Sequence, residues 1–218
     1  MQEPKISPEQ SKTLATTKYV KLYDLAYENG VHYYDASRRD KDQLFAFKQD
    51  PELGSALPDA VCAVIIVKEA GQEDKLLLFY EYRYPAGSYL LGLPAGLIDP
   101  ADLASPDPIK TAMIREIKEE TGLSIGKKDT VEVINPLVFT ASGFSDESNA
   151  IVKVVIHVDD LSALNHKGAE GTEVFGDFKL VDKEEARSLL KEGRDDYGHY
   201  LPLVAWAALC YFVSDLWK

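Results

Sequence analysis

The sequence has 218 residues, of which 45% are hydrophobic and 28% are charged, and its formal net charge is −12 at pH 7. This composition and length fit one globular domain with some residues to spare, and they exclude a disordered or fibrous chain. The acidic balance argues against a nucleic-acid partner, because binding a phosphate backbone requires a surface rich in Lys and Arg. An anionic ligand would therefore have to be bound locally, by a few arginines or by metal ions.

The chain shows no sign of a membrane span or of a zinc or disulfide framework. Its longest apolar run, residues 201–213, contains Pro202 and Trp206 and is shorter than the roughly 20 residues that a span needs. The N-terminus lacks a secretory pattern, so we expect a cytoplasmic protein with no membrane partner. Cys62 and Cys210 lie in apolar runs and are expected to be reduced, and the four histidines are too scattered for a zinc site.

Two segments rich in Tyr and Val near the N-terminus predict a β-hairpin. Residues 18–27 and 31–37 flank a turn at Asn29 and Gly30, and the Asn-Gly pair supplies the positive φ angles of a tight turn. A two-stranded hairpin is only marginally stable by itself. We therefore expect this arm to pack on the rest of the chain or on another chain.

A linker is predicted at residues 49–58, which contain two prolines and a glycine. It divides the sequence into an N-terminal β arm at 1–58, expected to contribute to dimerisation and substrate contacts, and a larger domain at 59–218. This domain begins with an apolar run at 61–67, which predicts a strand buried on both faces, and residues 75–84 predict its antiparallel partner.

Strand and helix signals then alternate along the larger domain. Asp107 before Pro108 is a helix start and Gly122 is a helix stop. The expected elements are strands at 131–139, 150–158 and 173–180 and helices at 108–121, 182–193 and 202–216, the last of them well buried. This order predicts a mixed α/β fold.

Three carboxylates lie on one face of the helix expected at 108–121. Glu116, Glu119 and Glu120 are spaced i, i+3 and i+4, so their side chains converge. Such a face is either a solvated charged surface or a set of oxygen ligands of the kind that Mg²⁺ or Mn²⁺ requires. Apolar residues on the adjacent arc should anchor the helix in the core and leave the carboxylates beside a groove.

Residues 115–123, Arg-Glu-Ile-Lys-Glu-Glu-Thr-Gly-Leu, resemble the core of the Nudix box. This box is the metal-binding loop–helix–loop of enzymes that hydrolyse nucleoside diphosphates linked to another group. Residues 93–99 and 81–85 resemble the segments that open and precede the box in ADP-ribose pyrophosphatases. The resemblance extends from the arm to about residue 190. It implies an α/β fold, namely the Nudix α/β/α sandwich with a mixed sheet, preceded by the β-hairpin arm.

The same resemblance implies a function. The main hypothesis is that the protein hydrolyses the diphosphate bond of ADP-ribose to give AMP and ribose 5-phosphate. Mg²⁺ is the expected cofactor, and Mn²⁺ is the alternative ion. The nearest rival is a Nudix pyrophosphatase for another nucleoside diphosphate sugar. The alternative hypothesis from a different functional class is a Nudix-like sensor that binds a nucleotide without hydrolysing it. Retention of all three glutamates favours catalysis.

The sequence departs from the family pattern at three points. Gly96 and Arg115 are separated by 18 residues where the family has 13, and the five extra residues fall around 100–106, where a loop insertion is thermodynamically tolerated. The position eight before Arg115 is Asp107, whose side chain has less reach than the family's glutamate. Ser142 replaces the proline of a Ser-Pro-Gly loop, which weakens the assignment to ADP-ribose in particular.

The resemblance also assigns the residues around the metal. The expected metal ligands are Glu116, Glu119, Glu120 and the Ala95 carbonyl. Arg115 is expected to organise these carboxylates, and Gly96 and Leu97 to lie beside the substrate. Gly96 is either a plain turn glycine or a position where no side chain fits because the backbone approaches the metal.

Further substrate contacts are carried over from matching positions. Arg83 and Arg39 match residues beside the diphosphate and the terminal sugar, and Arg38 takes the place of Arg39 if the arm shifts by one residue. Tyr34 matches an aromatic ring that stacks on adenine, an interaction that selects weakly among bases. The alternative is that Tyr33 and Tyr34 are ordinary strand residues, one buried and one exposed.

The general base is expected outside the metal cluster, because a bound cation stabilises the anionic form of its ligands and makes them poor proton acceptors. Two loops, 143–147 and 167–173, offer Glu147, Glu170 and Glu173. Related pyrophosphatases place this glutamate just before the strand expected at 173–180, so Glu173 is favoured.

The arm also predicts a two-fold homodimer. An isolated hairpin cannot bury its apolar face, and a symmetric exchange in which residues 18–39 reach the partner's active site would cover it.

Overall fold

The structure is a computed structural model that describes residues 3–48, 54–169 and 171–218. The chain forms two compact units, which we call the small unit, Met1–Asp59 with Leu137–Asn149, and the large unit, Ala60–Pro136 with Ala150–Lys218. Within the described ranges, no helix is long and apolar enough to cross a membrane. Half of the predicted linker, residues 49–53, lies outside the described residues.

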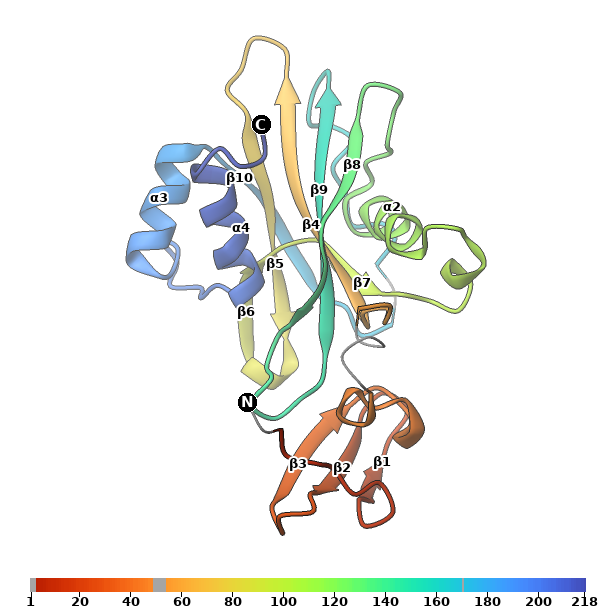
Figure 1. Ribbon diagram of the computed structural model, residues 1–218. Coiled ribbons are helices and arrows are strands. Elements are labelled where there is room, and N and C mark those ends of the chain that lie inside the picture. Colours follow the sequence, from red (N-terminus) through yellow and green to blue (C-terminus); the bar gives the residue numbers. More distant parts are fainter. Residues whose placement is uncertain (1–2, 49–53, 170) are drawn as a thin grey trace. The chain divides into compact units, whose positions relative to one another are not determined.

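The small unit is built on a three-stranded antiparallel sheet with the order β1-β2-β3 (Figure 1). Its strands are β1 (Lys12–Thr16), β2 (Lys21–Ala26) and β3 (His32–Ser37), followed by the 3-10 turns η1 (Lys41–Gln43) and η2 (Phe45–Phe47). β2 and β3 form the predicted hairpin, and Gly30 has the expected positive φ of 81°. The sequence did not predict β1.

The described residues of the large unit form a seven-stranded sheet and three α-helices. Its main strand order is β10-β5-β4-β9-β8, with β6 paired to β5 and β7 paired to β4. The strands are β4 (Ala60–Glu69), β5 (Lys75–Arg83), β6 (Ser88–Gly92), β7 (Ala95–Leu97), β8 (Thr130–Phe139), β9 (Ser148–Val158) and β10 (Phe175–Val181). The helices are α2 (Pro108–Thr121), α3 (Lys183–Glu192) and α4 (Leu203–Val213), with 3-10 turns η3 (Tyr84–Ala86) and η4 (Asp102–Ala104).

β4 is buried on both faces, as its continuous apolar run predicts. Val64 and Ile66 pack in the core that includes residues of α3 and α4, whereas Ala63 and Ile65 pack in the core that includes residues of α2. Figure 1 shows α2 on one face of the sheet and α3 and α4 on the other. The large unit is therefore the predicted α/β/α sandwich.

The helix that carries the acidic residues begins and ends as the sequence predicts. The Asp107 side chain caps α2 by accepting a hydrogen bond from the Lys110 N–H at 3.2 Å, and Gly122 ends the helix with a φ of 74°. Met113 and Ile117 are fully buried and fix the rotation of the helix about its axis. The last helix was predicted less accurately, because α4 ends at Val213 rather than at 216.

Candidate active site

Two of the three carboxylates on α2 are withdrawn from solvent. Glu116 is 7% exposed and Glu120 is 4% exposed. Burial raises the pKa of Glu116 to about 7, although the nearby Arg115 opposes this rise. Burial, followed by the negative charge of Glu116, raises the pKa of Glu120 well above its ordinary value. The face is therefore not the solvated surface that a Glu-rich helix usually presents.

Arg115 lies among the carboxylates and organises them, as the resemblance implies. Its Nη1 donates to Glu116 Oε1 at 2.7 Å and to Glu119 Oε2 at 3.0 Å. Its Nη2 donates to the Leu97 carbonyl and to Asp102 Oδ2, both at 2.9 Å. Burial would lower the pKa of Arg115, but Asp102 and Glu116 raise it and keep the guanidinium charged. One side chain thus ties α2 to β7 and to η4.

The partner of Arg115 is Asp102, which the sequence analysis missed. Asp102 is 3% exposed, and it stands six residues after Gly96, the spacing at which the family has its glutamate. Burial would raise the pKa of Asp102, but hydrogen bonds from Arg115 and from the Asp99 N–H hold it below its usual value. Counting forward from Gly96, rather than back from Arg115 to Asp107, would have found it. The extra residues therefore follow Asp102 and leave the ion pair intact.

The strand β7 brings backbone against the buried carboxylates. The Ala95 N–H donates to Glu120 Oε2 at 2.9 Å. Gly96 lies so close to Glu116 that a Cβ atom at this position would overlap the Glu116 carboxylate. Gly96 is therefore more than a turn residue, because its missing side chain provides the space that Glu116 occupies.

Glu173 and Arg83 belong to the same acidic region of the large unit. The negative charge of Glu173 contributes to the raised pKa values of Glu81, Glu116 and Glu120. Arg83 at the end of β5 donates to Glu81 Oε2 at 2.6 Å, and its side chain is 48% exposed. Glu81 was not singled out from the sequence. Glu170, the alternative candidate for the general base, lies outside the described residues.

The donor set fits a divalent cation chemically, although the carboxylates are engaged by protein groups. Among the described residues, no three His, Cys, Asp or Glu side chains are grouped as a set that could hold an ion. Glu116 and Glu119 instead share the Arg115 guanidinium, and Glu120 accepts from the backbone. The fit rests on two buried carboxylates with raised pKa values, which a divalent cation would stabilise in their ionised forms.

Arg39 belongs to the small unit, where it makes internal contacts. Its guanidinium lies 2.8 Å from Asp59 and 3.4 Å from Asp146, donates to Ser148 Oγ at 3.2 Å, and stacks on the Phe45 ring at 3.9 Å. The Arg39 side chain is only 12% exposed. A direct contact with a sugar would have to replace some of these interactions.

The other two predicted residues of the small unit differ in their surroundings. Glu147 accepts from Arg38 Nε at 2.8 Å, so both side chains are already paired. Tyr33 and Tyr34 are 49% and 61% exposed, which contradicts the alternative reading that one of them is buried.

Tyr34 lines an aromatic hollow of about 330 Å³ within the small unit. Its aromatic walls come from Tyr27, Tyr33, Tyr34, Phe139 and Phe144. Asp35 and Asp146 also line it, and each has one buried carboxylate oxygen without a hydrogen-bond partner among the described residues. Burial, followed by the charge of Asp146, raises the pKa of Asp35 to about 6.

We expect Asp35→Asn to stabilise the protein at pH 7.5 by about 1–3 kcal/mol. Because the folded state raises the pKa of Asp35 from 3.8 to about 6, ionised Asp35 lowers the unfolding free energy. This cost is absent below pH 4, grows as the pH rises from about 4 to 6, and is complete above pH 6. Urea unfolding between pH 4 and 7.5 should show the difference between wild type and variant growing over this window. An equal difference at every pH would contradict the assignment.

Comparison with known proteins agrees with the fold and the acidic helix. The NUDIX domain model matches residues 56–204. The chain is 32% identical over 127 residues to the ADP-sugar pyrophosphatase of Mus musculus, covering 58% of this chain and 54% of that protein. It is 29% identical over 126 residues to the ADP-ribose pyrophosphatase of Saccharomyces cerevisiae, covering 58% and 50%. The chain thus spans about half the length of the curated relatives it matches.

The fold is also that of a solved structure. The crystal structure of an ADP compounds hydrolase superposes with a TM-score of 0.56 at 20% identity, covering 99% of this chain and 97% of that chain. The chain belongs to the Nudix hydrolase family. Members of this family generally depend on a divalent metal ion.

Proposed function

We propose that this protein hydrolyses the diphosphate bond of a nucleoside diphosphate sugar, with ADP-ribose giving AMP and ribose 5-phosphate as the leading reaction. The observation that carries the proposal is the gathering of Glu116, Glu120 and Glu173 in one acidic region of the large unit. The pyrophosphatase relatives support it, because their names specify ADP-ribose and ADP-sugar substrates.

The proposed metal ligands are Glu116, Glu119, Glu120 and the Ala95 carbonyl. Bound Mg²⁺, or Mn²⁺ in its place, would neutralise the diphosphate charge and lower the pKa of a coordinated water. Arg115 would hold the carboxylates in place through its contacts with Glu116 and Glu119. The Arg115–Asp102 ion pair would keep that guanidinium fixed while the ligands turn toward the ion.

The other residues of the site would act on water and substrate. Glu173, which we do not assign to the metal, would accept a proton from the attacking water. Arg83 has a half-exposed guanidinium and would donate hydrogen bonds to diphosphate oxygens, with Glu81 orienting it.

The aromatic hollow of the small unit would bind the nucleobase of the substrate. Ring faces such as that of Tyr34 stack on any base, so stacking alone gives little selectivity. Asp35 and Asp146 offer carboxylate oxygens that only accept hydrogen bonds when ionised, and these would favour bases with N–H donors on their edges.

The decisive test is a panel of nucleoside diphosphate sugars incubated with the protein and Mg²⁺, followed by quantification of nucleoside monophosphate. Release of AMP from ADP-ribose at the highest kcat/KM supports the leading reaction. A higher kcat/KM for another member moves the assignment to that sugar nucleotide. Tight binding of a panel member without turnover of any supports the sensor.

We further propose that the protein is a two-fold homodimer in which residues 18–39 reach across to the partner's active site, an exchange that would cover the apolar face of the hairpin. Several apolar side chains of the arm are exposed, namely Leu14, Tyr19, Val20, Leu22 and Val31. Sedimentation at micromolar concentration should show a species of twice the 24.2 kDa chain mass. A single species of the chain mass would remove the proposal.

A further inference from the structure

His166 lies in the segment between β9 and β10, where its ring is enclosed by aromatic side chains. It stacks on Phe178 with ring centroids 4.0 Å apart and an interplanar angle of 16°, and on Phe175 at 4.8 Å and 27°. Phe79 of β5 meets it edge-on at 5.3 Å. The ring is therefore held against β10, the strand that follows Glu173.

The polar atoms of His166 face the end of α2. Its Nδ1 lies 2.5 Å from the Glu120 carbonyl oxygen, and because a carbonyl only accepts, Nδ1 must carry the proton. Its Nε2 is buried and, among the described residues, has no hydrogen-bond partner. His166 thus satisfies a carbonyl that the helix end leaves free.

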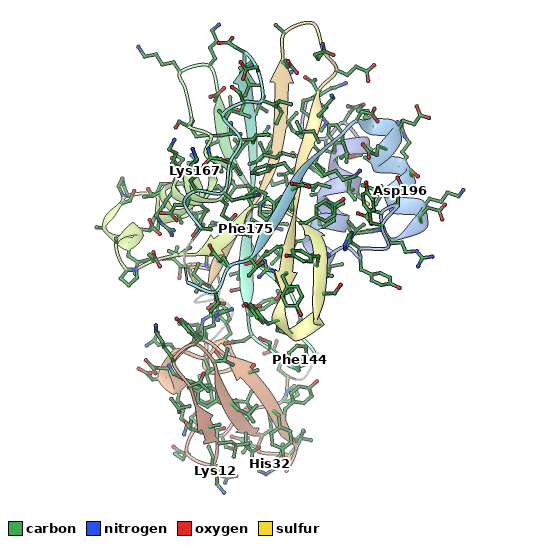
Figure 2. All side chains as sticks on the ribbon, turned by 180° about the vertical axis from the view of Figure 1, so that it is seen from behind. Lys12, His32, Phe144, Lys167, Phe175 and Asp196 are labelled. Atoms are coloured by element: carbon green, nitrogen blue, oxygen red, sulfur yellow. The ribbon has the colours of Figure 1, made fainter. Side chains whose placement is uncertain are left out.

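Residues next to His166 in the chain also contact the last turn of α2. The Asn165 N–H donates to the Thr121 carbonyl at 3.0 Å. A Cβ atom added to Gly168 would lie 2.5 Å from the Glu119 carbonyl oxygen, so only glycine allows this approach. Figure 2 labels Lys167, which follows His166, and Phe175, against which the His166 ring stacks. The segment therefore contacts the backbone of three successive residues of α2.

We propose that His166 is a positioning residue that fixes the last turn of α2 relative to Glu173. That turn carries Glu119 and Glu120, and Glu173 lies between His166 and β10 in the chain. Both functions of the ring are needed, because stacking ties it to β10 and the Nδ1–H ties it to α2. The inference rests on the proposed function, in which Glu173 is the base and the glutamates of α2 hold the ion.

The two functions of the ring can be separated by substitution. His166→Phe keeps a stacking ring but loses the donor, and we expect kcat to fall about 10- to 100-fold, the scale expected for misplaced catalytic groups, with KM changed less than about twofold. His166→Asn supplies an amide donor near the Nδ1 position and should recover part of kcat. Gly168→Ala should reproduce the kcat loss by displacing the segment from Glu119.

A control and a second readout make the outcome unambiguous. His157→Phe removes another hydrogen-bonded imidazole, which pairs with Asp129 at 3.1 Å, and should leave kcat unchanged. In metal-free protein, hydrogen exchange at the Asn165 amide should accelerate in His166→Phe but not in His157→Phe. Mn²⁺ alone, titrated by electron paramagnetic resonance, should bind His166→Phe more weakly than wild type.

The results separate this inference from the proposed function. If wild type hydrolyses no panel member, the proposed function fails, and faster Asn165 exchange with weaker Mn²⁺ binding still supports the positioning of the α2 turn by His166. Unchanged exchange and unchanged Mn²⁺ affinity in His166→Phe would overturn the inference. In active protein, a wild-type kcat in His166→Phe would also overturn it.

Discussion

Replacing Glu173 by glutamine is expected to lower kcat by about 10²–10⁴-fold, the effect typical of removing a positioned general base. We propose Glu173 as this base because its negative charge acts on the carboxyl groups of Glu81, Glu116 and Glu120. Metal affinity should survive the substitution, since the proposed ligands remain. The measurement is kcat as a function of Mg²⁺ concentration, in which the maximum should fall while the half-saturating concentration stays near that of wild type.

The other loop glutamates provide the comparison. Glu147→Gln removes a carboxylate that is paired with Arg38 in the small unit, and Glu170→Gln removes the remaining candidate. We expect kcat to fall far less in both variants than in Glu173→Gln. Near-normal turnover in Glu173→Gln would refute the assignment, and a loss confined to one of the others would move the base there.

Replacing Glu120 by glutamine should have opposite effects on activity and on stability. Glu120 is 4% exposed, and burial raises its pKa, so the ionised form is costly in the metal-free fold. Glutamine keeps an oxygen that can accept from the Ala95 N–H but carries no charge. We expect the unfolding free energy at pH 7.5 in a chelator to rise by about 1–3 kcal/mol, the range that mutational data give for burying a polar group. Turnover should fall by about 10²-fold or more, because the substitution removes one of the proposed metal ligands.

Glu132→Gln is the matched control, since this glutamate of β8 has a side chain that is 61% exposed and pairs with Lys153. Its unfolding free energy should change by less than about 0.5 kcal/mol, the usual range for surface substitutions. Urea unfolding in chelator and steady-state kinetics with Mg²⁺ measure both effects. A Glu120→Gln variant that is less stable than wild type, or that retains full turnover, would contradict the role of Glu120 as a desolvated ligand.

Most elements of the large unit, but not β6 and β7, could be predicted because their signals are local. Asp107, Pro108 and Gly122 mark both ends of α2, and the three glutamates follow a spacing that only a helix converts into one face. The apolar run of β4 likewise needs no distant information to be read as a buried strand. β1 escaped prediction because all five of its residues are exposed, so it has no alternating apolar pattern.

The features that the sequence did not reveal depend on contacts between residues that are far apart in the chain. The aromatic hollow joins Tyr27 and Tyr34 with Phe139 and Phe144, more than 100 positions later, and no local spacing encodes that meeting. Arg39 matched a family position, but its burial against Asp59 and Asp146 could be seen only in three dimensions. The four histidines are too scattered in the sequence for a zinc site, and the partner of His166 is a backbone carbonyl, which no pattern of side chains can indicate.

The alternation of β4 between two cores bears on how the large unit unfolds. Val64 and Ile66 pack in one core, whereas Ala63 and Ile65 pack in the other. Detaching this single strand would therefore remove packing contacts from both cores at once. Because both helix layers pack on this one strand, we expect the loss of either layer to weaken the packing of the other. The large unit should therefore lose its structure in one cooperative step rather than layer by layer. The stability of the acidic helix α2 should therefore depend partly on α3 and α4, which pack on the opposite face of the sheet.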